Sequence, residues 1–201
     1  MLDDSAMDNS HHILVGLGNP GREYSGTRHN VGFMLIDRLA VRLEARGMRL
    51  QSGALVTTAR YEGQKILLAK PQTYMNLSGR SVQGLARFYK SPLEHLLVAY
   101  DDLDLPLGTL RLRSGGGPGG QKGMASTIES LGSKDVSRLR IGIGRPPARM
   151  DPAAYVLQEF SETELETISE VLGQAEEAAL VFVGEGIEVA MNRFNRGPAA
   201  A

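Results

Sequence analysis

The sequence predicts an α/β fold: a single-domain, three-layer α/β/α arrangement, with a mixed, mostly parallel twisted sheet between helices. Short apolar runs such as residues 12–17 (HILVGL) and 96–100 (LLVAY) have the length of buried strands. Segments with apolar residues at helical spacing alternate with these runs, which is typical of a sheet covered by helices on both faces. The length of 201 residues suits one domain with a substantial core.

The first half of the chain supplies helix and hairpin signals. Apolar residues recur at helical spacing from Val31 to Leu43, and Gly47 follows as a C-terminal stop. Two further apolar stretches, separated by Glu62-Gly63, are typical of two strands joined by a turn. The elements predicted here are a helix over residues 30–46, strands over 54–61 and 65–69, and a helix over 76–90.

The second half contains a glycine-rich segment between regular elements. Residues 109–113 alternate basic and apolar side chains, which suits a strand with one solvated face. Residues 114–123 (SGGGPGGQKG) then indicate a mobile lid, a segment that contacts ligand through its backbone, or a plain flexible connection. The elements predicted after it are a helix, a strand over 139–143, an amphipathic helix over 162–183 and a short helix to about Phe194.

The ends of the chain and its composition bound the remaining possibilities. We expect residues 1–10 to be a flexible extension, residues 11–196 to form the single α/β domain, and residues 197–201 to be a flexible tail. The polar start lacks the basic and apolar regions of a signal peptide, and no apolar run approaches the roughly 20 residues that span a bilayer. The chain has no cysteine, which excludes disulfides and thiolate sites. We therefore expect a cytoplasmic protein that does not bind membranes.

The charges are arranged in blocks although the net charge is only −1. Residues 111–149 contain eight Lys and Arg side chains, opposed by Glu129 and Asp135. Residues 151–180 contain eight acidic side chains and no Lys or Arg. Such a pattern predicts one basic and one acidic face. Chance clustering on an ordinary solvated surface explains the pattern equally well.

Residues 16–21 (GLGNPG) match the G-x-G-x-x-G pattern of dinucleotide-binding proteins and follow a predicted strand. In those proteins a helix opens within the motif, so that its N-terminus meets the pyrophosphate. Here a polar stretch, residues 22–28, separates the motif from the predicted helix, and no acidic residue ends a second strand at the expected distance. We interpret the segment as a tight turn that presents Asn19 at the carboxyl end of the strand.

Two polar residues and two polar residue pairs, far apart in the sequence, are expected to meet at the carboxyl ends of strands, where open α/β sheets place their sites. Each also has a plain structural explanation, because asparagines cap helices and a histidine before a helix is commonly a solvated loop residue. They are Asn19, the pair His29-Asn30, Asn76, and the pair Asp101-Asp102.

Together these residue types indicate a particular chemistry. A histidine paired with a carboxylate can take a proton near neutral pH, and asparagine amides can donate hydrogen bonds to a developing oxyanion. The sequence has no cysteine, no G-x-S-x-G motif and no metal-ligand spacing. This combination favours water activated by a base over a covalent intermediate, and it suits hydrolysis of an ester. No cofactor and no metal are expected.

The sequence also resembles the bacterial peptidyl-tRNA hydrolase family. The matching segments are VGLGNPGREYSGTRHNVGF, KPQTYMNLSGRSV, LVAYDDLDLPLG and RLRIGIGRP, between about residues 13 and 145. The resemblance implies a single α/β/α domain. It also implies hydrolysis of the ester between tRNA and a peptide or N-blocked aminoacyl group, which recycles tRNA from stalled translation.

The resemblance implies roles for four residues of the predicted site. His29 would be the general base, and Asp101 would orient and stabilise its basic form. Asn19 would recognise the blocked α-amino group, and so separate peptidyl-tRNA from aminoacyl-tRNA. Asn76 would position the peptide or the water.

Further residues would bind the acceptor stem and CCA end of the tRNA. Tyr24 and Tyr74 would contact the terminal nucleotides, on which an aromatic ring can stack. Arg113 and Arg140 match basic positions of the family that bind phosphate, for which arginine is well suited.

The sequence departs from the family pattern after the glycine-rich segment. Many members have a His-Asn pair where this chain has Gln121-Lys122. The family asparagine helps to hold the peptidyl end of the substrate, whereas lysine donates hydrogen bonds but accepts none. Lys122 is therefore a candidate phosphate contact, and substrate affinity or turnover is expected to differ.

Two other functions are also compatible with the sequence. One is a non-catalytic RNA-binding relative with the same fold, resembling plastid splicing factors; it would not need His29, Asp101 and Asn19 together. The other is a nucleotide-dependent oxidoreductase, which an NAD titration would detect. We expect a monomer, because the sequence contains no exposed apolar stripe.

Overall fold

The computed structural model describes residues 10–147 and 149–195. A seven-stranded sheet forms its centre, with the strand order β2-β3-β4-β1-β5-β7-β6. The strands are β1 (His11–Gly16), β2 (Arg49–Gln51), β3 (Ala54–Tyr61), β4 (Gln64–Pro71), β5 (Leu96–Asp102), β6 (Leu110–Arg113) and β7 (Ser137–Gly142). The helices are α1 (Val31–Arg42), α2 (Ser78–Tyr89), α3 (Lys122–Leu131), α4 (Pro152–Val156), α5 (Glu162–Glu185) and α6 (Ile187–Phe194). Four 3₁₀ turns are η1 (Arg22–Tyr24), η2 (Arg28–Asn30), η3 (Met75–Leu77) and η4 (Leu93–His95).

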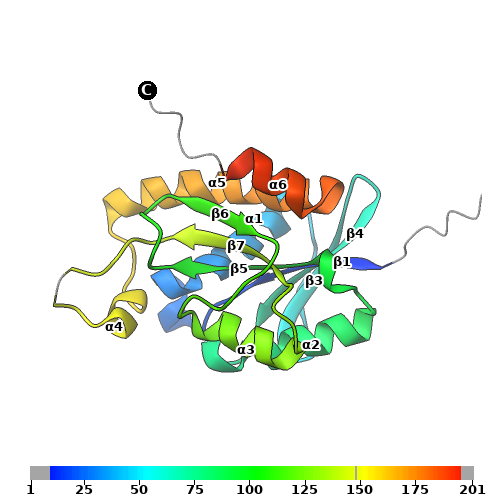
Figure 1. The fold of residues 1–201 in the computed structure, drawn as a ribbon, viewed down its shortest axis with the longest axis horizontal. Coiled ribbons are helices and arrows are strands. Elements are labelled where there is room, and N and C mark those ends of the chain that lie inside the picture. The colour runs from blue at the N-terminus through cyan, green and yellow to red at the C-terminus, as the bar shows by residue number, and fades with distance from the viewer. Residues whose placement is uncertain (1–9, 148, 196–201) are drawn as a thin grey trace, which may run out of the picture.

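Helices cover both faces of the sheet, as Figure 1 shows. Alternate residues of β1 point to opposite faces, as in any strand. Leu14 packs in a core with residues of α1, α5 and α6. Ile13 and Val15 pack in a second core with residues of α2 and α3. The three-layer α/β/α prediction is therefore confirmed.

The parallel part of the sheet is its centre. β4, β1, β5 and β7 are successive neighbours and pair in parallel. The pairs β2–β3, β3–β4 and β6–β7 are antiparallel. The sheet is mixed, as predicted, with its antiparallel pairs toward the two edges. Because β4, β1 and β5 run in the same direction, the segments that follow them gather at one end of the sheet, where the carboxyl ends of these strands lie.

The structure differs from the sequence prediction in several details. The predicted helix over residues 30–46 ends at Arg42, because Glu44 adopts a positive φ of 52° that no helix accommodates. The three-residue strand β2 and the five-residue helix α4 were not predicted; both are too short to show a periodic pattern. Within the predicted terminal segments, residues 1–9 and 197–201 lie outside the described residues.

The glycines of residues 16–21 serve close packing. A Cβ atom on Gly16 would lie 2.0 Å from the carbonyl oxygen of Gly32 in α1, and a Cβ on Gly18 would lie 2.8 Å from the Phe33 ring. Gly21 has a φ of 117°, which favours glycine. The segment leads into η1 and η2, and α1 begins only at Val31. This geometry does not present a helix N-terminus to the motif, unlike a dinucleotide fingerprint.

Candidate active site

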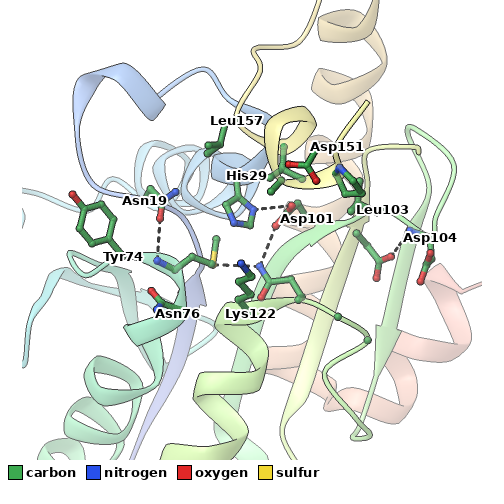
Figure 2. Close-up of a pocket in the computed structure, with 18 residues that line it drawn as sticks. Asn19, His29, Tyr74, Asn76, Asp101, Leu103, Asp104, Lys122, Asp151 and Leu157 are labelled. Atoms are coloured by element: carbon green, nitrogen blue, oxygen red, sulfur yellow. Dashed lines mark hydrogen bonds and ion pairs between the residues drawn. The ribbon is translucent and has the colours of Figure 1, made fainter. Parts of the chain in front are cut away.

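A cleft of about 660 Å³ opens at the carboxyl ends of the central strands β1, β4 and β5. Its walls come from the segments after these strands, from the glycine-rich segment with the start of α3, and from α4. Figure 2 shows His29 and Asp101 in the middle of the labelled side chains, with Tyr74 on one side and Asp104 and Asp151 on the other. The predicted site residues that line this cleft are Asn19, His29, Tyr74, Asn76, Asp101 and Lys122.

His29 and Asp101 form the central pair of the cleft. The Nδ1 atom of His29 lies 2.9 Å from Oδ2 of Asp101. The side chain of Asp101 is 3% exposed, and that of His29 is 14% exposed. An ionised carboxylate only accepts hydrogen bonds, so the proton of the neutral imidazole lies on Nδ1. The lone pair of Nε2 then becomes available to a ligand in the cleft.

Asn19 is held in one orientation by two neighbouring segments. Its backbone N–H donates to Oδ1 of Asn30 (2.8 Å), and Nδ2 of Asn30 donates to the carbonyl oxygen of Asn19 (2.9 Å). Its own side-chain Oδ1 accepts the backbone N–H of Met75 at 2.9 Å. Because the amide oxygen is used in this way, the NH₂ group of Asn19 is left to donate into the cleft.

Neither of the two asparagines that precede helices caps a helix with its side chain. Asn30 precedes α1, but its side chain makes no capping hydrogen bond and instead holds the backbone of Asn19. Asn76 lies within η3, and the residue that caps α2 is Leu77. The exposed side chain of Asn76 lines the cleft.

Arg28 anchors the turn that carries His29. Its guanidinium donates to both carboxylate oxygens of Glu164, at 2.9 and 2.7 Å, and to the carbonyl oxygens of Gln158 and Glu159. It also lies over the ring of Tyr155, 4.3 Å from the centroid. Burial raises the pKa of Glu164, but hydrogen bonds from Ser161 and Arg28 outweigh it, so that this pKa falls below its ordinary value of 4.5.

The predicted basic face contains fewer exposed side chains than the eight basic residues of the block suggest. Arg138 is 1% exposed, and its guanidinium donates to four backbone carbonyl oxygens, including those of Gly116 and Gly117 at 2.9 and 2.8 Å. Burial lowers the pKa of Arg138. Nη1 of Arg111 donates to the carbonyl oxygen of Asn195. Arg138 therefore fixes the first part of the glycine-rich segment and is not a surface charge.

Arg140 forms an ion pair with the neighbour of Asp101. Its Nε atom lies 2.5 Å from Oδ2 of Asp102, and the side chain of Arg140 is 18% exposed. Burial alone would lower the pKa of Arg140, but the hydrogen bond from its side chain to Asp102 raises it. Among the described residues that line the cleft, Arg140, Arg113 and Tyr24 do not appear. Arg113 is exposed, and Tyr24 lies half-buried in η1.

Gln121 contributes to the site in a way that the sequence did not predict. From the sequence, Gln121-Lys122 was recognised only as a departure from the family pattern. In the structure, Nε2 of Gln121 lies 3.1 Å from Oδ1 of Asp101, and Lys122 is exposed at the start of α3. A glutamine before a helix is an unspecific signal, so the pattern alone did not reveal this contact.

The described residues contain neither a metal-binding cluster nor a helix that could cross a membrane. Over residues 10–147 and 149–195, no group of three or more His, Cys, Asp or Glu side chains is placed to hold a metal ion. Over the same ranges, no helix is long and apolar enough to cross a membrane.

The chain matches known proteins along most of its length. The family model of the peptidyl-tRNA hydrolases matches residues 13–201. The chain belongs to the peptidyl-tRNA hydrolase family. A family member from Mycobacterium avium (strain 104) is 48% identical over 184 residues, which cover 91% of this chain and 96% of the relative. A member from Desulfitobacterium hafniense (strain Y51) is also 48% identical, and the match covers 92% of this chain and 99% of the relative.

Solved structures agree with this assignment. The crystal structure of peptidyl-tRNA hydrolase from Acinetobacter baumannii has a TM-score of 0.86 and 34% sequence identity, and the match covers 95% of this chain and 97% of that one. The family predicted from the sequence motifs is thus confirmed. The members of this peptidyl-tRNA hydrolase family are enzymes, and this chain is one of them.

Proposed function

We propose that the protein hydrolyses peptidyl-tRNA with a water molecule that His29 activates. The observation that carries the proposal is the hydrogen bond between Nδ1 of His29 and Asp101 in a cleft at the carboxyl ends of the strands. This bond leaves Nε2 as the base. Membership in the peptidyl-tRNA hydrolase family supplies the substrate: an ester between the carboxyl group of a peptide and the terminal ribose of a tRNA.

In the proposed reaction, Nε2 of His29 removes a proton from water as the water oxygen attacks the ester carbonyl carbon. The carboxylate of Asp101 stabilises the imidazolium that results. When the tetrahedral intermediate collapses, the bond to the ribose oxygen breaks and the imidazolium returns the proton to that oxygen. The products are the free peptide and the tRNA, and His29 is neutral again.

Asn19 and Asn76 are proposed to place the acyl part of the substrate. The NH₂ group of Asn19 is a fixed donor, because its oxygen accepts the N–H of Met75. In our proposal it donates to the carbonyl of the group that blocks the substrate α-amine, an acceptor that unblocked aminoacyl-tRNA lacks. Asn76, which is exposed in the cleft, would position the peptide or the attacking water.

The tRNA is proposed to bind through stacking and phosphate contacts. Tyr74 lines the cleft and is 62% exposed, so its ring is available to a terminal base of the CCA end. Lys122 at the rim and Arg113 on β6 are exposed and are candidates for phosphate contacts. Tyr24 and Arg140 lie outside the cleft lining and are kept as tRNA contacts on the strength of the motif resemblance.

We further propose that the enzyme works in the cytoplasm, because its substrate comes from translation. We also propose that it is a monomer and needs no cofactor or metal. Light scattering on the purified protein measures the mass directly. A mass near 21.7 kDa is expected, and a dimer mass would contradict the proposed state.

The proposal is tested by incubating the protein with N-acetyl-aminoacyl-tRNA and, separately, with unblocked aminoacyl-tRNA, while the release of tRNA is followed. We expect cleavage of the blocked substrate, loss of turnover in His29→Ala, and tRNA binding close to that of the wild type. The control is His11→Ala, since His11 lies at the amino end of β1, opposite the end that meets the cleft.

Two outcomes would contradict the proposal. Turnover that survives in His29→Ala would remove this residue as the base. A wild-type protein that binds tRNA but cleaves neither substrate would favour the non-catalytic RNA-binding alternative.

A further inference from the structure

Gln121 connects the glycine-rich segment to the proposed catalytic pair. It is the N-cap residue of α3, and its Oε1 accepts the backbone N–H of Met124 at 2.7 Å. Its Nε2 donates to Oδ1 of Asp101 at 3.1 Å and lies 3.3 Å from Sδ of Met75. The side chain thus spans the distance between a helix N-terminus and the carboxylate that holds His29.

The chemistry of the partners fixes the orientation of the Gln121 amide. The N–H of Met124 can only donate, so it requires the amide oxygen. The carboxylate of Asp101 can only accept, so it requires the NH₂ group. An amide turned by 180° would set a donor against a donor and an oxygen against the carboxylate. The two contacts therefore support each other.

The two carboxylate oxygens of Asp101 have different hydrogen-bond partners. Its Oδ2 faces Nδ1 of His29, and its Oδ1 faces Gln121. Asp101 is 3% exposed, so water is largely excluded from this group. A buried carboxylate oxygen without a donor is costly, and the side chain would relax towards any other donor within reach. Such a rotation would weaken the hydrogen bond to His29.

We propose that Gln121 is a positioning residue: it holds the carboxylate of Asp101 in the orientation that keeps the proton of His29 on Nδ1. Gln121 acts through Asp101 and is not assigned a contact with the substrate. This inference rests on the proposed function, because it gives the His29–Asp101 pair a third member. It also gives the glutamine a role other than substrate affinity.

Three variants separate positioning from helix capping. Gln121→Ser keeps a good N-cap, but its side chain is too short to reach Asp101. Gln121→Ala loses both contacts. Gln121→His restores an N–H that can donate towards Asp101. For each variant we would measure kcat and KM with N-acetyl-aminoacyl-tRNA, and Tm by thermal unfolding.

We expect kcat to fall by about tenfold in both the Ser and the Ala variants, comparable to the effect of removing the hydrogen-bond partner of a metal-ligating residue in metalloenzymes. KM should stay within about twofold, and Gln121→His should recover most of the lost kcat. Tm should fall further in Gln121→Ala than in Gln121→Ser, because only the Ala variant also loses the N-cap. Wild-type kcat in Gln121→Ser would overturn the inference, and so would a change confined to KM. Either result would leave the base assignment intact if His29→Ala remains inactive, whereas an active His29→Ala would overturn the proposed function itself.

Discussion

Arg28-His29 and Asp101-Asp102 are two pairs of consecutive residues, and one member of each pair meets the other at the centre of the cleft while its neighbour binds elsewhere. His29 and Asp101 bind each other, at 2.9 Å. Arg28, one residue before His29, binds Glu164, and Asp102, one residue after Asp101, binds Arg140. Successive residues of a strand point to opposite faces, and the turn η2 separates its side chains in a similar way.

The comparison shows how the site is held. The two outer ion pairs tie η2 to α5 and the end of β5 to β7. They fix the backbone at His29 and at Asp101 through neighbours that take no part in the His29–Asp101 hydrogen bond. The inner pair would perform the reaction, and the outer pairs would keep its members at hydrogen-bond distance. The inner pair and the two outer pairs are therefore expected to respond differently to mutation.

The largest expected effect comes from replacing one aspartate or the other. In Asp101→Asn, the amide can donate to Nδ1 and so move the histidine proton to Nε2, which removes the base. We expect kcat to fall by about 10³-fold or more, as found when other histidine–carboxylate pairs are changed in this way. Asp102→Asn is the matched control, and its kcat should stay within about threefold of the wild type. Equal losses in the two variants would show that Asp101 has no special relation to His29.

The sequence predicted the fold and most of the cleft because those features depend on local patterns. Strand and helix periodicity gave the layers, and the placement of polar residues after strands brought Asn19, His29 and Asp101 together. The ion pair of Arg140 was not predictable in this way. It depends on the register in which β7 pairs with β5, which places Arg140 opposite Tyr100 and near Asp102.

The burial of Arg138 was also not predictable from local sequence patterns. In the sequence it is one of eight basic residues in a block, and nothing local distinguishes it from Arg113. In the structure it is buried because four backbone carbonyls, from residues 116, 117, 134 and 136, converge on it. A count of charges therefore overstated the basic face. Gln121 was missed for a similar reason, since its partner Asp101 is 20 residues away.

A smaller effect, on stability, is expected at the outer pair next to His29. Glu164→Gln removes the charge that faces Arg28 but keeps a side chain able to complete the capping box with Ser161. We expect the free energy of unfolding to fall by about 2 kcal/mol at pH 7, the scale of a hydrogen bond to a charged group. Urea unfolding monitored by circular dichroism measures it. The control Glu162→Gln changes an exposed acid of the same turn and should alter stability little.

The pKa of Glu164 adds a pH signature to that prediction. Because the folded protein lowers this pKa, the ionised carboxylate stabilises the fold at pH values above about 4.5, its ordinary pKa. The stabilisation is lost as the pH falls through the lowered value. The difference between the wild type and Glu164→Gln should therefore shrink in acid. A difference that is independent of pH would show that lost packing, and not the charge of Glu164, causes the destabilisation.

The smallest expected effect distinguishes the arginine of the other outer pair from an exposed one. Arg113 has an exposed side chain, whereas Arg140 already neutralises Asp102. We therefore expect Arg113→Gln to reduce the slope of log K for tRNA binding against log salt by about 1, the effect of one lost phosphate contact. Arg140→Gln should change this slope less, because the charge of Arg140 is already neutralised by Asp102 and so releases fewer counterions from the tRNA. Filter binding of tRNA between low and moderate salt measures both slopes. If Arg140→Gln gave the larger decrease, its guanidinium would have to bind phosphate while it remains paired with Asp102, and the outer pair at β5 would then belong to the tRNA-binding surface as well as to the support of the site.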